Sequence, residues 1–238
     1  MWTYVLLSIF VMLVLAWAFY WHDRSSSCFK QGKYGTHDAP FCTIKKMMYA
    51  LPEDVRSSIL LHVDSKHAGK RVEIPKMRSG RTMMASYVTE NIPELVELYN
   101  RTTNVVGQTI GTPVSVAPLS TELSLSVIVY EKERDGIEWH YDDNYFQGRF
   151  FTVLIPVTVD DTCTVFQFRN HLGQPQNVRL EPGEALLFEG SKLLHRATPL
   201  CDGQRRVIIS MQFTTDPKVR YPWLMKLKEY AFQGLRFW

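Results

Sequence analysis

The hydrophobic pattern of the chain begins with a long apolar run. Residues 2–21 read WTYVLLSIFVMLVLAWAFYW and contain no charged side chain. At a helical rise of about 1.5 Å per residue, this run would span roughly 30 Å, the hydrocarbon thickness of a bilayer. Aromatic residues stand at both of its ends, where they favour the membrane interface. We therefore expect residues 1–21 to form a single-pass N-terminal transmembrane helix.

Two properties of this segment stay open. Ala16-Trp17-Ala18 resembles the small-residue site at which a secretory signal peptide is cleaved, so removal is an alternative to a retained anchor. The basic residues that follow the anchor favour the cytoplasm for the rest of the chain. Cys28 and Cys42, in contrast, flank a short loop that a lumenal disulfide could close, although all four cysteines can equally be free thiols. We expect a membrane location, in the endoplasmic reticulum or another endomembrane, with the side left open.

A polar linker and a helical region come next. We assign residues 22–43 to the linker and residues 44–121 to an N-terminal helical support region. The pattern of residues 43–63 predicts two short helices, and Pro52 lies at the start of the second. After a basic, loop-like stretch, residues 91–110 predict a further helix with Asn91 as its N-cap.

From residue 122 the pattern changes to short β-like runs separated by turn residues such as Asp135-Gly136 and Pro182-Gly183. Seven or eight short strands at this spacing predict a sandwich or barrel, and the intervals are too short for the helical crossovers of a parallel sheet. The sequence thus predicts a mostly β fold with flanking helices, a core over residues 122–214 and a closing amphipathic helix over residues 215–238. The predicted strands are LSLSVIVYE, GIEWHY, FFTVLIPVTV, TVFQF, QNVRL, EALLFEG and RRVIISMQF.

Composition adds little to this picture. A hydrophobic content of 45% with 21% charged residues is typical of a packed globular protein. The net charge of +3 and the absence of any run of five like charges give no sign of nucleic acid as a partner.

Titratable residues cluster beside one of the predicted strands. His140 and Asp142 are two positions apart, so on a strand both would point to one face, and His195 lies in a later strand. A histidine and an aspartate near a turn are commonly capping groups at the surface, and a single histidine such as His195 is commonly a half-buried residue of the core or its rim. Together, two imidazoles and one carboxylate occupy one face of an octahedral Fe(II) and leave three positions open. The same set also suits Zn(II). We predict that these three residues form a metal site.

A pair of arginines opens the last predicted strand. Arg205 and Arg206 precede the apolar run VIISMQF. A guanidinium that enters a buried strand is costly unless an anion meets it. The far carboxylate of 2-oxoglutarate would be such an anion, and an arginine can bind it through two hydrogen bonds.

Over residues 122–214 the chain resembles the double-stranded β-helix (jelly-roll, cupin-like) core of the Fe(II)/2-oxoglutarate-dependent oxygenases, in particular the prolyl 4-hydroxylase-like branch. The resemblance is carried by the run YEKERDGIEWHYDDNYFQGRFFTVLIPV and by PGEALLFEGSKLLHRATPLCDGQRRVIISMQF. It implies that His140, Asp142 and His195 bind Fe(II). It also implies that Arg206, rather than Arg205, anchors 2-oxoglutarate and that Tyr130 lines the same pocket.

The resemblance implies a dioxygenase that uses Fe(II), 2-oxoglutarate and O2, with ascorbate as an optional reductant, to hydroxylate a protein or small-molecule substrate. A peptidyl proline is one candidate, although Ile155-Pro156-Val157 departs from the pattern of many prolyl hydroxylases. The alternatives are a cupin-type metal enzyme that does not use 2-oxoglutarate and an inactive, membrane-tethered interaction module. A nucleic-acid demethylase is disfavoured because Gln212 stands where such enzymes often have a second arginine. The sequence does not indicate an oligomeric state.

Overall fold

The computed structural model describes residues 10–12, 14–15, 44–65, 68–158, 162–170, 172–220, 222–223 and 225. The predicted linker lies outside these residues, and so do Cys28, Cys42 and most of the predicted anchor and closing helix. Within the part of the chain that is described, no helix has the length and apolar character needed to cross a membrane.

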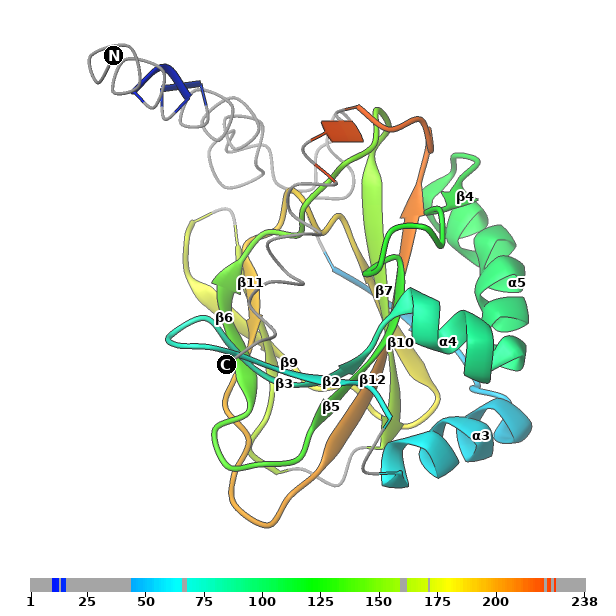
Figure 1. Ribbon diagram of the computed structural model, residues 1–238, viewed down its shortest axis with the longest axis vertical. Coiled ribbons are helices and arrows are strands. Elements are labelled where there is room, and N and C mark those ends of the chain that lie inside the picture. Colours follow the sequence, from blue (N-terminus) through cyan, green and yellow to red (C-terminus); the bar gives the residue numbers. More distant parts are fainter. Residues whose placement is uncertain are drawn as a thin grey trace, which may run out of the picture.

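A curled antiparallel sheet forms the body of the molecule, and three helices lie along one side of it (Figure 1). Among the described residues the sheet has twelve strands, ten of which follow the order β1-β10-β7-β12-β5-β3-β6-β11-β8-β9, while β2 pairs with β3 and β4 with β12. The sheet and its few helices fit the predicted jelly-roll core with flanking helices. The helices are α3 (Glu53–Asp64), α4 (Ala85–Asn91) and α5 (Pro93–Ile110). The strands are β1 (Lys45–Met48), β2 (Lys70–Ile74), β3 (Arg78–Met83), β4 (Ser115–Val116), β5 (Leu125–Tyr130), β6 (Gly136–His140), β7 (Phe150–Thr158), β8 (Phe166–Arg169), β9 (Pro175–Val178), β10 (Glu184–Phe188), β11 (His195–Ala197) and β12 (Arg206–Thr214).

The alternation of side chains along the central strands separates a hydrophobic core from a cavity that is lined by both polar and apolar residues. Successive residues of a strand point to opposite faces. In β5, β7 and β12 the odd-numbered apolar residues pack against the helices and are almost completely buried, as Val127, Val153 and Ile209 illustrate. The even-numbered residues line a cavity inside the curled sheet, as Ser126, Thr152 and Ser210 illustrate. The helices therefore stabilise the outer face of these strands and leave the inner face available.

The region over residues 44–121 contains more strand than the sequence suggested. Residues 45–48 form β1, where a first short helix was predicted, and only the second predicted helix is present, as α3. The basic stretch predicted as a loop contains the hairpin β2–β3 and the short helix α4. Asn91 ends α4, and the N-cap of α5 is Ile92. The segments KRVEI and RSGRTM are rich in charged residues, which are typical of loops, so the sequence did not predict these strands. A charged side chain is nevertheless compatible with a strand wherever its charged group reaches solvent or an acidic partner.

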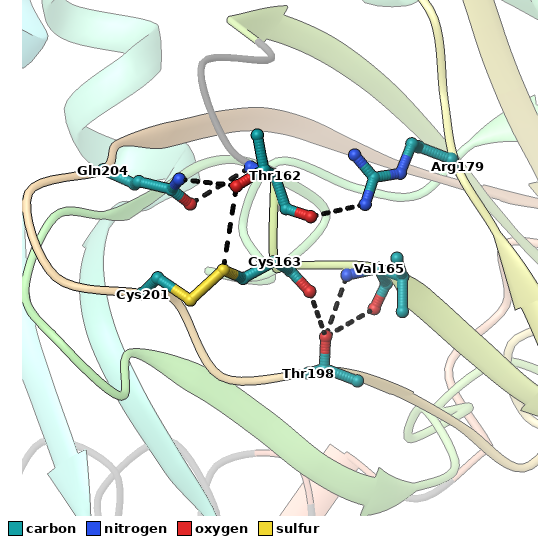
Figure 2. The surroundings of a disulfide bond; sticks show 7 residues. All are labelled: Thr162, Cys163, Val165, Arg179, Thr198, Cys201 and Gln204. Carbon is teal, nitrogen blue, oxygen red and sulfur yellow. Dashed lines mark hydrogen bonds between the residues drawn. A yellow bond between two sulfur atoms is a disulfide. The ribbon is translucent and has the colours of Figure 1, made fainter.

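A disulfide bond joins two loops at one end of the sheet. Cys163 and Cys201 have Cα atoms 5.9 Å apart and lie 38 positions apart in the sequence. Figure 2 shows the hydrogen bonds around it: Gln204 Nε2 donates to Thr162 Oγ1, and the backbone N–H of Val165 donates to Thr198 Oγ1. The sequence did not single out this pair. The bond ties the connection between His195 and Arg206 to the loop that precedes β8.

Candidate active site

The three predicted metal ligands converge at one end of the cavity. His140 is the last residue of β6, His195 is the first residue of β11, and the two are direct neighbours across the antiparallel pair. Asp142 follows the end of β6, where its backbone N–H donates to the carbonyl of Gly190. One potential ligand atom from each of the three side chains lies within 4.8 Å of the other two. Strand pairing therefore joins residues that are 55 positions apart in the sequence.

Backbone contacts orient both imidazoles. Nδ1 of His140 lies 2.8 Å from the carbonyl oxygen of Glu138, and Nδ1 of His195 lies 2.8 Å from that of Leu193. A carbonyl oxygen can only accept, so each Nδ1 carries a hydrogen, and in the neutral imidazole it is Nε2 that has the free lone pair. Both Nε2 atoms lie 3.6 Å from Oδ1 of Asp142. This separation is too long for a hydrogen bond and suits ligands that share one ion.

The carboxylate of Asp142 is held from its other side. Oγ1 of Thr152, in β7, donates to Oδ2 of Asp142 at 2.6 Å and leaves Oδ1 facing the imidazoles. Gly190 makes room for this arrangement, since a Cβ atom there would lie 2.0 Å from Asp142 Oδ2. Neither supporting residue could be predicted from the sequence, because a threonine within an apolar strand and a glycine after one have no distinctive pattern.

The protonation states of the site suit a cation. Burial alone would raise the pKa of Asp142, but His195, His140 and the Thr152 hydroxyl hold it below its usual range. Burial, together with the neighbouring His140, lowers the pKa of His195 to about 4. A carboxylate and neutral imidazoles are the forms that bind metal ions. The donor set and its supports therefore fit a divalent transition metal.

Aromatic rings fix the buried histidine. The ring of Phe166 stacks on His195 at a centroid distance of 5.4 Å, and Phe188 meets the same imidazole edge-on at 4.8 Å. The side chain of His195 is only 6% exposed, against 27% for His140. One ligand thus sits in the apolar wall, and the other faces the open part of the cavity.

The cavity beside the triad has a volume of about 370 Å³, within the usual range for small-molecule sites. Arg206 and Tyr130 both line it, and they are direct neighbours across β12 and β5. Burial raises the pKa of Tyr130 despite the opposing charges of Arg78 and Arg206, so its hydroxyl stays protonated and can donate. Arg205 points away, and its Nη1 binds Asp64 Oδ1 at 2.6 Å on the surface. Of the two predicted arginines, Arg206 is the one inside.

No family model matches this sequence, and neither does any curated protein. The similar solved structures include the non-heme alpha ketoglutarate dependent carbocyclase SnoK from nogalamycin biosynthesis, with a TM-score of 0.58 and 12% identity over 83% of this chain and 88% of that one. The epimerase SnoN, in complex with Fe3+, alpha ketoglutarate and nogalamycin RO, has a TM-score of 0.56 and 13% identity over 72% and 78% of the two chains. A prolyl hydroxylase from Trichoplax adhaerens, in complex with a peptide fragment, has a TM-score of 0.50 and 12% identity over 79% and 90%.

These similarities establish the fold. The chain has the double-stranded β-helix architecture of the Fe(II)/2-oxoglutarate-dependent oxygenases, including the prolyl hydroxylases. At identities of 12–13% the comparison extends to the fold and not to the substrate.

Proposed function

We propose that the protein is an Fe(II)- and 2-oxoglutarate-dependent dioxygenase that hydroxylates a protein or small-molecule substrate. The observation that carries the proposal is the convergence of His140, Asp142 and His195 at the edge of a cavity that also contains a buried arginine. Two imidazoles and one carboxylate are the ligand set of non-heme Fe(II) oxygenases, and they leave positions open for cosubstrate and oxygen.

Arg206 and Tyr130 favour 2-oxoglutarate over a metal enzyme that works without it. A cupin-type hydrolase or isomerase has no need of a guanidinium that is only 6% exposed. A guanidinium that lines the cavity beside the triad is placed to bind a carboxylate of a ligand through charge-assisted hydrogen bonds. In the proposed complex, Arg206 binds the distal carboxylate of 2-oxoglutarate, and the protonated hydroxyl of Tyr130 donates to the same group.

In the proposed enzyme, the residues of this chain bind and orient the metal ion and the cosubstrate, and they exclude water from the site. His140, Asp142 and His195 hold the ion, while Thr152 keeps Asp142 in place. When bound, Fe(II) with 2-oxoglutarate and O2 supplies the oxidising chemistry, which yields succinate and carbon dioxide and hydroxylates the substrate. Ascorbate would serve as an external reductant. Phe166 and Phe188 keep water away from the buried side of the site.

A peptidyl proline is one candidate substrate. It is supported by the similarity to a prolyl hydroxylase whose structure was solved with a peptide fragment. Ile155-Pro156-Val157 lies in the strand β7, where this chain departs from many prolyl hydroxylases. Another group on a peptide, or a group on a metabolite, is therefore an alternative site of hydroxylation.

We also propose that the catalytic domain works in an oxidising compartment, attached to an endomembrane by residues 1–21. The Cys163–Cys201 disulfide supports the compartment, because such bonds persist mainly outside the reducing cytosol. The uncharged run of residues 2–21 supports the attachment. Protease protection in sealed microsomes is expected for the catalytic domain, and digestion without detergent would contradict the proposal.

The test of the proposed activity is the formation of succinate. Purified protein is incubated with Fe(II), 2-oxoglutarate, ascorbate and O2, without added substrate, and succinate is followed by NMR. We expect slow, iron-dependent succinate formation by the wild type and none by His140→Ala. If the folded, iron-loaded wild type neither binds nor consumes 2-oxoglutarate, a cupin-type enzyme or an inactive module is the better assignment.

A further inference from the structure

The same cavity contains a second arginine that the proposed function does not use. Arg78 is the first residue of β3, and its Nη2 donates to Thr82 Oγ1 at 2.7 Å. Arg78, Gly80 and Thr82 alternate along the strand and share one face, so the arginine side chain runs along the strand past Gly80. A Cβ atom at Gly80 would lie 3.0 Å from the ring of Tyr130. Gly80 thus leaves room for the tyrosine beside the arginine.

The charge of Arg78 is poorly compensated where it lies. Its Nε is buried without a hydrogen-bond partner, and among the described residues its guanidinium forms no ion pair. Burial lowers the pKa of Arg78, and Tyr130 and Asp142 are the groups that oppose this effect. Arginine nevertheless stays charged in proteins, so an anionic ligand that paired with this guanidinium would be stabilised.

The balance of charges inside the cavity shows whether the metal ion and the cosubstrate could compensate the charge of Arg78. Of the aspartate, glutamate, lysine and arginine residues that line the described cavity, Lys76, Glu138 and Asp143 are exposed to solvent, and Arg196 pairs with Glu138. Asp142, Arg78 and Arg206 are at least half-buried and are the charges of its interior. A divalent ion together with Arg206 balances Asp142 and the two carboxylates of 2-oxoglutarate. Arg78 is then left as the one uncompensated interior charge among these groups.

Arg78 also lies on the side from which a substrate can approach. Ile74 at the end of β2 and Lys76 and Met77 in the turn before β3 line the cavity, and Met77 is 61% exposed. Arg206, in contrast, lies in the central strand β12 beside Tyr130. A second hollow of about 460 Å³ also includes Arg78 in its lining but includes none of the three candidate metal ligands.

We propose that Arg78 binds a carboxylate of the primary substrate, so that the enzyme oxidises an acid. The inference rests on the proposed function and narrows its substrate class to molecules with a carboxylate close to the oxidised carbon. The carboxylate can belong to a free organic acid or to an acidic side chain of a peptide. In both cases the guanidinium replaces the water that the carboxylate loses and fixes the substrate beside the metal.

Matched acid and amide pairs test this inference without knowledge of the natural substrate. The free-acid pair is phenylacetate and phenylacetamide. The peptide pair is the N-acetyl methylamide of glutamate and that of glutamine. Their dissociation constants are measured by ligand-observed NMR on protein loaded with redox-inert Zn(II), with and without 2-oxoglutarate. The variants are Arg78→Gln, Arg78→Lys and, as a control, Arg101→Gln on the exposed surface of α5.

We expect the wild type to bind at least one acid about tenfold more tightly than its amide, as a charge-assisted hydrogen bond allows. This preference should disappear in Arg78→Gln, survive in part in Arg78→Lys and be unchanged in Arg101→Gln. Whichever pair shows the preference identifies a free acid or a peptide side chain as the source. Near-UV circular dichroism checks that each variant is folded.

Three results would overturn the inference: no acid preference in the wild type, an undiminished preference in folded Arg78→Gln, or a loss of 2-oxoglutarate affinity in Arg78→Gln as large as in Arg206→Gln. The last result would assign Arg78 to the cosubstrate site instead. Failure of the proposed function is distinguishable, because the wild type would then not bind 2-oxoglutarate. The acid preference measured without 2-oxoglutarate would still decide the role of Arg78.

Discussion

His195 lies directly opposite His140 across the antiparallel pair β11–β6, with a distance of 4.2 Å between the ring centroids. Each ring donates from Nδ1 to the carbonyl of the residue two positions earlier in its own chain segment. The two imidazoles thus present the same atom, Nε2, toward Asp142. The pairing register of these short strands therefore determines the geometry of the site.

The close approach of Gly190 to Asp142 gives the first prediction. In Gly190→Ala the new Cβ would lie 2.0 Å from Asp142 Oδ2, so the carboxylate must move away from the imidazoles. We expect metal affinity to fall about 10- to 100-fold, as for other losses of ligand support. Isothermal titration with Fe(II) under anaerobic conditions measures this. Gly107→Ala in α5, where the nearest contact is 3.4 Å, is the control and should bind as the wild type does.

The two neighbouring arginines should behave differently. Arg206→Gln removes the guanidinium that lines the cavity, and we expect the KM for 2-oxoglutarate to rise about 10- to 100-fold. Arg205→Gln removes only a surface ion pair with Asp64 and should change this KM little. Initial rates of succinate formation give both values. A larger effect from Arg205→Gln would contradict the assignment of the cosubstrate pocket.

Asp135 should make folding stability depend on pH. Burial would raise its pKa, but hydrogen bonds from Arg71, Ser79 and two backbone N–H groups lower it below the usual value. A depressed pKa in the folded state stabilises the protein above the unfolded-state pKa of about 4, and this contribution is lost as the pH falls through the lower, folded-state value.

We therefore expect Asp135→Asn to lower the free energy of unfolding by about 2 kcal/mol at pH 7. The difference from the wild type should shrink as the pH falls below about 4. Urea denaturation at a series of pH values measures it. A difference that stays constant down to the acid transition would show that the carboxylate charge is not responsible.

The Cys163–Cys201 bond should stabilise the loops at its end of the sheet. Closing a loop of this length typically contributes about 2–4 kcal/mol. We expect the double variant Cys163→Ser, Cys201→Ser to unfold at a lower urea concentration, with a free energy of unfolding smaller by that amount. Its stability should not change when reductant is added. The wild type should approach the variant when reduced. Equal stability of oxidised and reduced wild type would contradict the pairing.

Much of the β-rich half could be predicted from the sequence because its strands are apolar and bounded by turn residues. FFTVLIPVTV and RRVIISMQF became β7 and β12 with ends shifted by only a residue or so. The hairpin β2–β3 was not predicted, because Arg71 and Arg81 look like loop residues until their acidic partners, Asp135 and Glu131, are known. Such partners are distant in the sequence and are identified only by the fold.

The candidate site, like the fold, could be predicted from the sequence only in part. The spacing of His140, Asp142 and His195 indicated a shared ion before any geometry was known, because this combination of donors has few other uses. Thr152 and Gly190 could not be found in the same way. Their importance lies in a hydroxyl direction and in the absence of a side chain, and both depend on how β7 and the loop after β10 meet Asp142.

Metal binding by the wild type and by single ligand variants is the most direct test of the central claim. Anaerobic calorimetric titration with Fe(II), followed by titration with 2-oxoglutarate, gives the stoichiometry and affinity of each. We expect one Fe(II) per chain, 2-oxoglutarate binding that requires the metal, and loss of both in His140→Ala and Asp142→Ala, which keep their near-UV circular dichroism. Undiminished Fe(II) binding by these folded variants would contradict the assignment of the site.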